Sequence, residues 1–172
     1  MATYTTNWQV TEVGAGGWQP IDETSTTKNH DLGTIVKATD RGTNANGVGE
    51  FVYAKGVAST ATGSWVTFLE DDWSTALLVA DAKGRVGVAM SANVANQYGW
   101  YQISGKAIGK ALTGYVDNAL VYGTATAGSV DDAVVSGDRV KKAIGASALD
   151  APATGMAEFE LDRPFVDDGS AT

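Results

Sequence analysis

Cysteine is absent from the sequence, and histidine occurs once, as His30. A chain without cysteine has neither a disulfide framework nor a thiol nucleophile, and it is compatible with a reducing cytoplasm. A single histidine gives a Ser-His-Asp triad one candidate base. No Gly-x-Ser-x-Gly nucleophile turn occurs. We therefore expect His30 to be a solvent-facing loop residue rather than a catalytic base.

Basic residues are also few, with twelve Lys and Arg against twenty Asp and Glu and a formal charge of −8. This charge repels a phosphate backbone, so we expect no nucleic-acid partner. No apolar run approaches the roughly 20 residues of a membrane span, and residues 1–8 lack the basic and apolar regions of a secretory signal. The sequence therefore predicts a soluble protein made in the cytoplasm, without a membrane partner.

What the chain does contain is typical of short strands joined by tight turns. The sequence contains 21 glycines and only three prolines, and 44% of its residues are hydrophobic. Its 172 residues are a suitable length for one domain. Helix signals are confined to Val116–Leu120 and Asp138–Ile144, and Gly137 and Gly145 limit the second. We predict an all-β fold, a small β-barrel or sandwich of about eight short strands with an extended N-terminal arm and at most one short helix.

Strand signals follow one another closely from Gly49. The clearest is a hairpin within Gly84–Gly105, whose second strand carries Trp100 and Tyr101. The other expected strands are 50–55, 64–69, 76–80, 106–112, 119–124, a segment around Val134–Val135, 139–144 and 156–161.

Residues 1–47 differ from the rest of the chain because their apolar residues are sparse among Thr, Asn, Gly and Asp. We interpret them as an extended arm whose large side chains dock into pockets, either on their own domain or on a neighbour. The alternative is an ordinary N-terminal strand with loops. The expected domains are this arm, a β domain over residues 48–166 and a flexible tail over 167–172. The predicted contact residues for a capsid or another subunit are Tyr4, Trp8, Trp18 and Ile21.

No group of residues predicts an enzyme, a metal site or a cofactor. The run Gly105–Ala111 lacks the spacing of a phosphate-binding loop and the Ser or Thr that would hold magnesium. The pairs Asp71-Asp72, Asp131-Asp132 and Asp167-Asp168 are interpreted as surface acids, with a weak calcium contact between subunits as the alternative. Glu158 and Glu160 share a strand face, which is more typical of a charged edge than of a glycosidase.

Aromatic residues support one alternative function. A surface glycan-binding β module would need exposed rings to stack on sugars, and the candidates are Trp65, Trp73, Trp100, Tyr98, Tyr101, Tyr115 and Tyr122. We expect most of these rings to fill the core instead.

Four segments, in this order, resemble a known family. They are Gly49-Glu-Phe-Val-Tyr-Ala-Lys-Gly-Val-Ala, Gly84-Arg-Val-Gly-Val-Ala-Met-Ser-Ala, Gly99-Trp-Tyr-Gln-Ile-Ser-Gly and Gly137-Asp-Arg-Val. Together they look like the head decoration, or cement, proteins of tailed double-stranded DNA bacteriophages. The resemblance covers about residues 47–166 and lies in the style and order of the segments.

The resemblance implies a structural virion protein that binds the outer surface of a phage capsid and stabilises the shell. Its partners would be the major capsid protein and further copies of itself, commonly as a homotrimer. An N-terminal arm across neighbouring capsid subunits would be typical of the family, although the segment here is longer than in the smallest decoration proteins.

Overall fold

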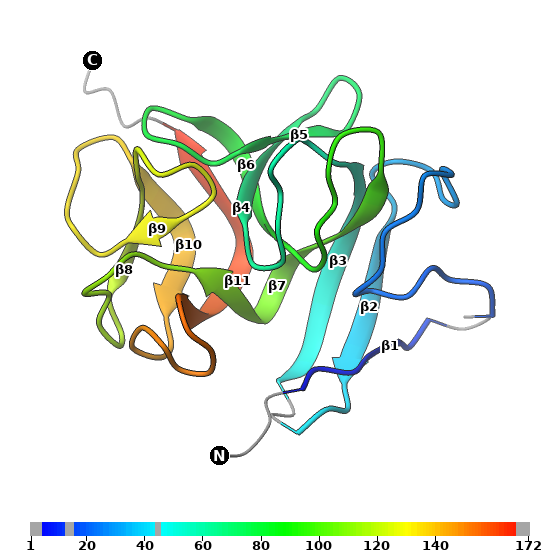
Figure 1. The fold of residues 1–172 in the computed structure, drawn as a ribbon, viewed down its shortest axis with the longest axis horizontal. Helices are drawn as coiled ribbons and strands as arrows, with labels where there is room; N and C mark the ends of the chain where they lie inside the picture. Colours follow the sequence, from blue (N-terminus) through cyan, green and yellow to red (C-terminus); the bar gives the residue numbers. More distant parts are fainter. Residues whose placement is uncertain (1–4, 13–15, 44–45, 168–172) are drawn as a thin grey trace.

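The protein is all-β in a computed structural model that describes residues 5–12, 16–43 and 46–167. No helix occurs in these residues, and eleven strands form one sheet (Figure 1). They are β1 Trp8–Val10, β2 Ile35–Asp40, β3 Gly47–Lys55, β4 Trp65–Leu69, β5 Ser74–Leu77, β6 Lys83–Ala89, β7 Tyr98–Lys110, β8 Leu120–Gly123, β9 Val130–Asp131, β10 Arg139–Gly145 and β11 Met156–Asp167. The all-β prediction is confirmed, with more strands than the eight or so predicted.

Strand pairing closes on itself in the middle of the sheet. The order β1-β2-β3-β5-β4-β6-β7-β11-β10-β8-β9 is supplemented by pairings of β3 with β7 and of β6 with β11. As a result β3, β5, β4, β6 and β7 form a closed circuit, in which the β3–β5 contact is parallel and consists of Lys55 opposite Ser74. Strand β11 pairs with both β7 and β6 of this circuit. The other strands extend on two sides, with β1 and β2 next to β3 and with β10, β8 and β9 next to β11 (Figure 1).

Three groups of buried side chains pack against these strands. The central core lies within the circuit and contains Val52, Ala54, Val66, Phe68, Ala89, Tyr101 and Ile103. The N-terminal core contains Trp8, Ile21, Val36, Ala38, Phe51, Tyr53 and Trp100. The C-terminal core is the largest, and its bulkier members include Trp65, Leu78, Tyr115, Phe159 and Leu161. Because successive strand residues point to opposite faces, β3, β4 and β6 each contribute to two cores.

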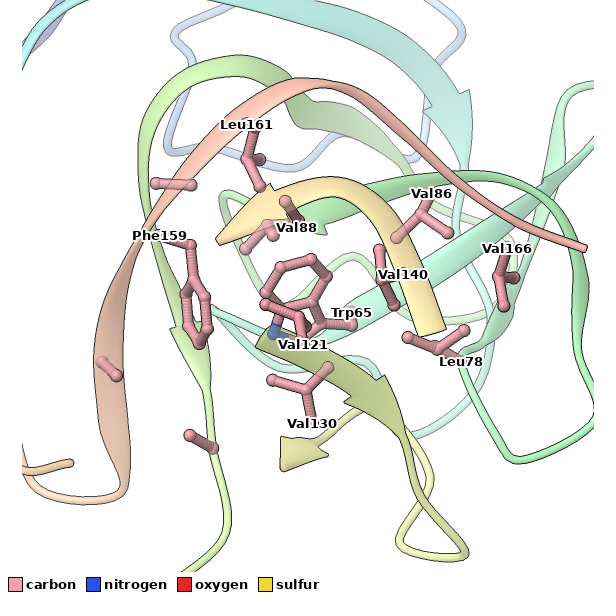
Figure 2. Packing of buried hydrophobic residues seen from close by; sticks show 14 of the residues in the cluster. Trp65, Leu78, Val86, Val88, Val121, Val130, Val140, Phe159, Leu161 and Val166 are labelled. Carbon is pink, nitrogen blue, oxygen red and sulfur yellow. The ribbon is translucent and has the colours of Figure 1, made fainter. Parts of the chain in front are cut away.

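Trp65 occupies the middle of the C-terminal core. Figure 2 shows its ring surrounded by Val88, Val121 and Val140, with Phe159 beside it. The Trp65 and Phe159 rings meet edge to face with 4.8 Å between centroids, a favoured arrangement for aromatic pairs. Strands β4, β6, β8, β10 and β11 are therefore held together by one apolar cluster.

The predicted hairpin is present as β6 and β7, with Val88 opposite Gln102 and Ala89 opposite Tyr101. Strand β7 does not end at Gly105, as predicted, but continues to Lys110. Gly105 has a φ of +88°, and a Cβ there would lie 2.5 Å from the carbonyl oxygen of Val48. A glycine therefore lets β7 pass from β3 to β11 without interruption.

The predicted boundary at residue 47 falls at the first residue of β3. The loop before it joins β2 to β3, which are paired from Ile35 opposite Val52 to Asp40 opposite Gly47. Strand β1 is paired with β2 in turn. Within the described part of residues 1–46, Trp8–Val10 and Ile35–Asp40 are thus strands of the sheet, while residues 16–34 take part in the sheet only as an isolated bridge between Ser25 and Tyr98. Of the predicted tail, Asp167 ends β11 and residues 168–172 lie outside the described residues.

The predicted strand around Val134–Val135 is wrong. Both residues lie in the exposed loop between β9 and β10, where the turn formers Ser136 and Gly137 follow directly. Across the described residues, no helix is long and apolar enough to cross a membrane.

Candidate functional site

The predicted contact residues of the N-terminal segment lie mainly inside the chain. Trp8 is 9% exposed and Ile21 is fully buried, both in the N-terminal core. The Trp8 ring meets Phe51 edge to face at 4.9 Å. Trp18 is half-buried against the same core, and Tyr4 lies outside the described residues. The side chains of Trp8 and Ile21 thus pack inside the chain's own domain. Little of their surface remains accessible for contact with a capsid.

The side chain of Gln19 fastens this segment to the sheet. Its Nε2 donates to the carbonyl oxygens of Glu23 (2.9 Å) and Tyr98 (3.1 Å). Its Oε1 accepts from the Asn29 amide (3.0 Å) and the Tyr53 hydroxyl (2.8 Å). Gln19 is 7% exposed, so a buried polar residue satisfies all of its hydrogen-bonding groups while joining distant parts of the chain.

The backbone of Gln19 engages His30 and Trp100. Its N–H donates to His30 Nε2 (3.0 Å), and its carbonyl oxygen accepts from Trp100 Nε1 (3.0 Å). The His30 ring also lies between the rings of Trp18, Tyr53 and Trp100. Burial lowers the pKa of His30, which favours the neutral ring that an accepting Nε2 requires. The expectation of a solvent-facing histidine is wrong, because this ring is half-buried and packs against Tyr53 and Trp100 of the N-terminal core.

Buried and paired carboxylates hold loops in place. Asp40 is 4% exposed and accepts from the N–H groups of Asn7, Gly42 and Asn46. It thereby joins the start of β1 to the β2–β3 loop. Asp138 is similarly buried and accepts from the Asp81 N–H at 2.7 Å. These carboxylates are engaged in structural contacts rather than arranged around a common point.

The acidic residues singled out in the sequence have similar roles. Asp72 accepts from the N–H and hydroxyl of Ser74, and these hydrogen bonds lower the pKa of Asp72. Glu158 pairs with Lys106 at 2.6 Å across β11 and β7, while Glu160 is exposed. No cluster of three or more potential metal-binding His, Cys, Asp or Glu side chains occurs within the described ranges.

Most of the aromatic rings that suggested glycan binding are interior. Trp65, Trp100, Tyr101, Tyr115 and Tyr122 are each at most 6% exposed. Trp73 and Tyr98 are half-buried. The aromatic residues in the described part of the chain therefore give no exposed platform of stacked rings, and the glycan-binding alternative loses the feature that suggested it.

Exposed apolar side chains gather at the end of the molecule formed by β8 to β10. Of the nine large hydrophobic residues that are exposed in the described part of the chain, five lie there, and we refer to them as the apolar end: Val116, Leu120, Val134, Val135 and Ile144. Leu120 and Ile144 are opposite each other on β8 and β10, and Val134 is 79% exposed. Single exposed apolar residues are ordinary, but two adjacent pairs, Leu120 with Ile144 and Val134 with Val135, on neighbouring elements are more typical of contact surfaces.

The two loops of the apolar end are joined, and they are acidic. The Val116 N–H donates to the Asp132 carboxylate at 3.0 Å, which ties the loop before β8 to the loop after β9. The pKa of Tyr115, beneath these loops, is raised by burial and then by the charges of Asp132, Asp131 and Asp117. Beside Leu120 and Ile144, by contrast, the surface includes the exposed basic residues Arg139 and Lys142 of β10. The charge around the apolar end is therefore mixed, and a partner that fits it would present an apolar surface with charges of both signs around it.

Sequence reasoning missed the apolar end because it assigned Val134–Val135 to a strand. The sequence does contain a pattern that indicates a loop here. Val134 and Val135 form a short apolar pair between the polar residues Asp131-Asp132 and the turn formers Ser136-Gly137. No family model, curated protein or solved structure matches this chain, so the geometry described above and the order of its sequence segments are the grounds for assigning a function.

Proposed function

We propose that this chain is a structural virion protein, a decoration or cement protein that binds the outer surface of a phage capsid and stabilises the shell. The observation that carries the proposal is the apolar end, where five exposed apolar residues lie on β8, on β10 and in the loops next to them. The four sequence segments that resemble head decoration proteins support it, since they lie on β3, β6, β7 and the start of β10.

The apolar end takes the role first given to the N-terminal segment. Trp8 and Ile21 support the domain from within, so attachment falls to side chains that are exposed: Val116, Leu120, Val134, Val135 and Ile144. Each copy offers a modest apolar surface. Many copies on one shell, grouped as trimers, would add their contributions through multivalency.

A closed domain suits such a role. The circuit of β3, β5, β4, β6 and β7 supports the predicted barrel over an open sandwich. Closure leaves the strands of the circuit with no free edges, and the edge strands that remain in the described part of the sheet, β1 and β9, are only three and two residues long. Few unpaired edges are therefore available for pairing between copies. A shell protein of this kind would keep its shape while its surface residues bind the capsid.

The test is sedimentation of the purified protein with capsids that lack it. We expect the wild-type chain to bind and a Val134→Asp/Val135→Asp variant to bind at least about tenfold more weakly, because each new carboxylate would lose water on contact. Val48→Asp is the matched control, since Val48 is 58% exposed but lies on β3, away from the apolar end. A wild-type chain without affinity for the capsid would refute the proposed function.

A different result would refute only the surface. If the wild-type chain binds and the Val134→Asp/Val135→Asp variant binds equally well, attachment uses another face. The stability of the shell supplies a second readout. Capsids that carry the wild-type chain should survive heat and osmotic shock better than bare capsids, and capsids mixed with the double variant should resemble bare ones.

A further inference from the structure

A pocket of about 370 Å³ lies beside the central core, away from the apolar end. Its floor consists of Val52, Phe68 and Ile103, which belong to that core. Trp73 and Phe165 add aromatic rings to its lining. A pocket with this volume and an apolar lining is on the scale of small-ligand sites, which span about 300–1,000 Å³.

Two arginines lie at this otherwise apolar pocket. Arg85 comes from β6 and Arg163 from β11, and their side chains are 62% and 58% exposed. Arg85 Nε lies 3.0 Å from the Glu70 carboxylate, and Arg163 contacts one oxygen of Glu50 through Nε and a terminal nitrogen, both at 3.1 Å. A guanidinium carries five N–H donors, so these ion pairs use only part of each donor set.

The backbone of β11 places Arg163 at the pocket. Strand β11 pairs with β7 as far as Asp162 opposite Ser104, and with β6 from Phe165 opposite Arg85 onward. Arg163 lies at this change of partner with a φ of 50°, a left-handed conformation that costs energy for a residue with a side chain. The same conformation occurs at Trp73, with a φ of 53°.

We propose that this pocket binds a small amphipathic anion, with its apolar body against Val52, Phe68 and Ile103 and its carboxylate or sulfonate on Arg85 and Arg163. The apolar floor favours a hydrocarbon or aromatic body, and charge complementarity with two guanidiniums selects the anionic group. Glu50 and Glu70 compete for the same arginines, so affinity is moderate and depends on them. The site holds one free molecule rather than a membrane surface, because its floor is enclosed by strands of the circuit. This inference does not rest on the capsid proposal.

The experiment compares three ligands that share one hydrocarbon chain. Decanoate, decanol and decyltrimethylammonium are titrated into the full chain below their aggregation concentrations, by calorimetry and by backbone amide shifts. We expect decanoate to bind at one site. Its affinity should be at least about tenfold higher than that of decanol or decyltrimethylammonium, because a charge-assisted hydrogen bond contributes about that ratio. Shifts should centre on the amides of Val52, Phe68, Ile103 and Arg163.

Variants then separate the charge from the cavity. Arg163→Gln should weaken decanoate about tenfold, and Glu50→Gln should strengthen it several-fold by releasing Arg163. Ile35→Trp should block the pocket, because Ile35 lines it and is 40% exposed, so a larger side chain there disturbs no core. Arg139→Gln is the matched control, since Arg139 is exposed on β10 outside this pocket.

Several outcomes would overturn the inference. Equal affinity for all three ligands would show simple hydrophobic adsorption. Amide chemical-shift changes centred away from the pocket would place the ligand elsewhere. The same conclusion would follow if neither Arg163→Gln nor Ile35→Trp changed the affinity for decanoate. Binding to anionic vesicles without binding of free decanoate would indicate a membrane surface, and no binding of decanoate at all would leave the pocket without the proposed ligand.

Discussion

Replacing Gln19 by Met should destabilise the fold by about 2–4 kcal/mol, because it removes four side-chain hydrogen bonds while conserving volume. The four partners do not contribute equally. Glu23 and Asn29 are exposed, so water replaces Gln19 there. The Tyr98 carbonyl still accepts from the Ser25 N–H at 3.0 Å.

The Tyr53 hydroxyl carries most of the expected effect. Tyr53 is fully buried, and its hydroxyl donates to Gln19 Oε1 at 2.8 Å. Loss of that acceptor leaves a buried donor without a partner, which costs about 1–3 kcal/mol. The other three hydrogen bonds together add about 1 kcal/mol after allowance for water. A Tyr53→Phe/Gln19→Met double variant should therefore be less destabilised than the sum of the two single variants.

The assay is urea unfolding at neutral pH, followed by tryptophan fluorescence and fitted for the free energy of unfolding and its denaturant slope. Gln9→Met is the control. Gln9 is exposed on β1, and its substitution should change stability by no more than about 0.5 kcal/mol. If Gln19→Met is as stable as Gln9→Met, the N-terminal segment is not fastened through this side chain, and our account of the N-terminal core is wrong.

Two further predictions concern the same segment. Deleting residues 1–20 should destabilise the domain strongly, because the deletion removes Trp8 and Gln19 and exposes the N-terminal core. A truncated chain with the circular dichroism spectrum of the full chain and an equally sharp melting curve would contradict this. Stability should also depend on the protonation of His30. Burial lowers the pKa of His30 below 6.5 in the folded chain, so the unfolded chain takes up the proton first as the pH falls. The stabilising contribution is present above about pH 6.5 and is lost below it. His30→Gln keeps an acceptor for the Gln19 N–H but does not titrate, so between about pH 7 and pH 5 its unfolding midpoint should fall less than that of the wild-type chain. If the unfolding midpoints of His30→Gln and of the wild-type chain fall equally with pH, His30 is not the source of the pH dependence of stability.

The parts of the fold that sequence predicted are those with local signals. Alternation in Val86, Val88 and the strand from Tyr98 is enough to indicate a hairpin, because β side chains alternate and the polar residues between them form a turn. Alternation in β11 places Phe159 and Leu161 inside and then shifts at Arg163, whose left-handed backbone resets the pattern.

The N-terminal segment could not be placed in this way. Its few large apolar side chains pack against large side chains supplied by other strands, as Trp8 packs against Phe51 of β3 and Trp18 against Trp100 of β7. Neither the spacing of Trp8 and Ile21 nor their composition shows that the outer face of β3 and β7 is apolar and needs a cover. That requirement arises only when β3 and β7 pair, and it depends on residues more than 30 positions away in the chain.

The apolar end was missed for a related reason. Val134 and Val135 have the composition of a strand, but a strand requires a neighbour. The adjacent strands β8 and β10 already pair with each other, and β9 ends at Asp131. Whether an apolar pair becomes core or surface is thus decided by which strand edges remain open, which is a property of the whole sheet.

The shared strands have a consequence for how the molecule can fail. Val66 and Phe68 point into the central core while Trp65, between the same neighbours, points into the C-terminal core. A slip of β4 by one residue would exchange the contents of both cores at once. The central and C-terminal cores thus share β4 as a common wall, and a substitution that displaces this strand should loosen both cores together.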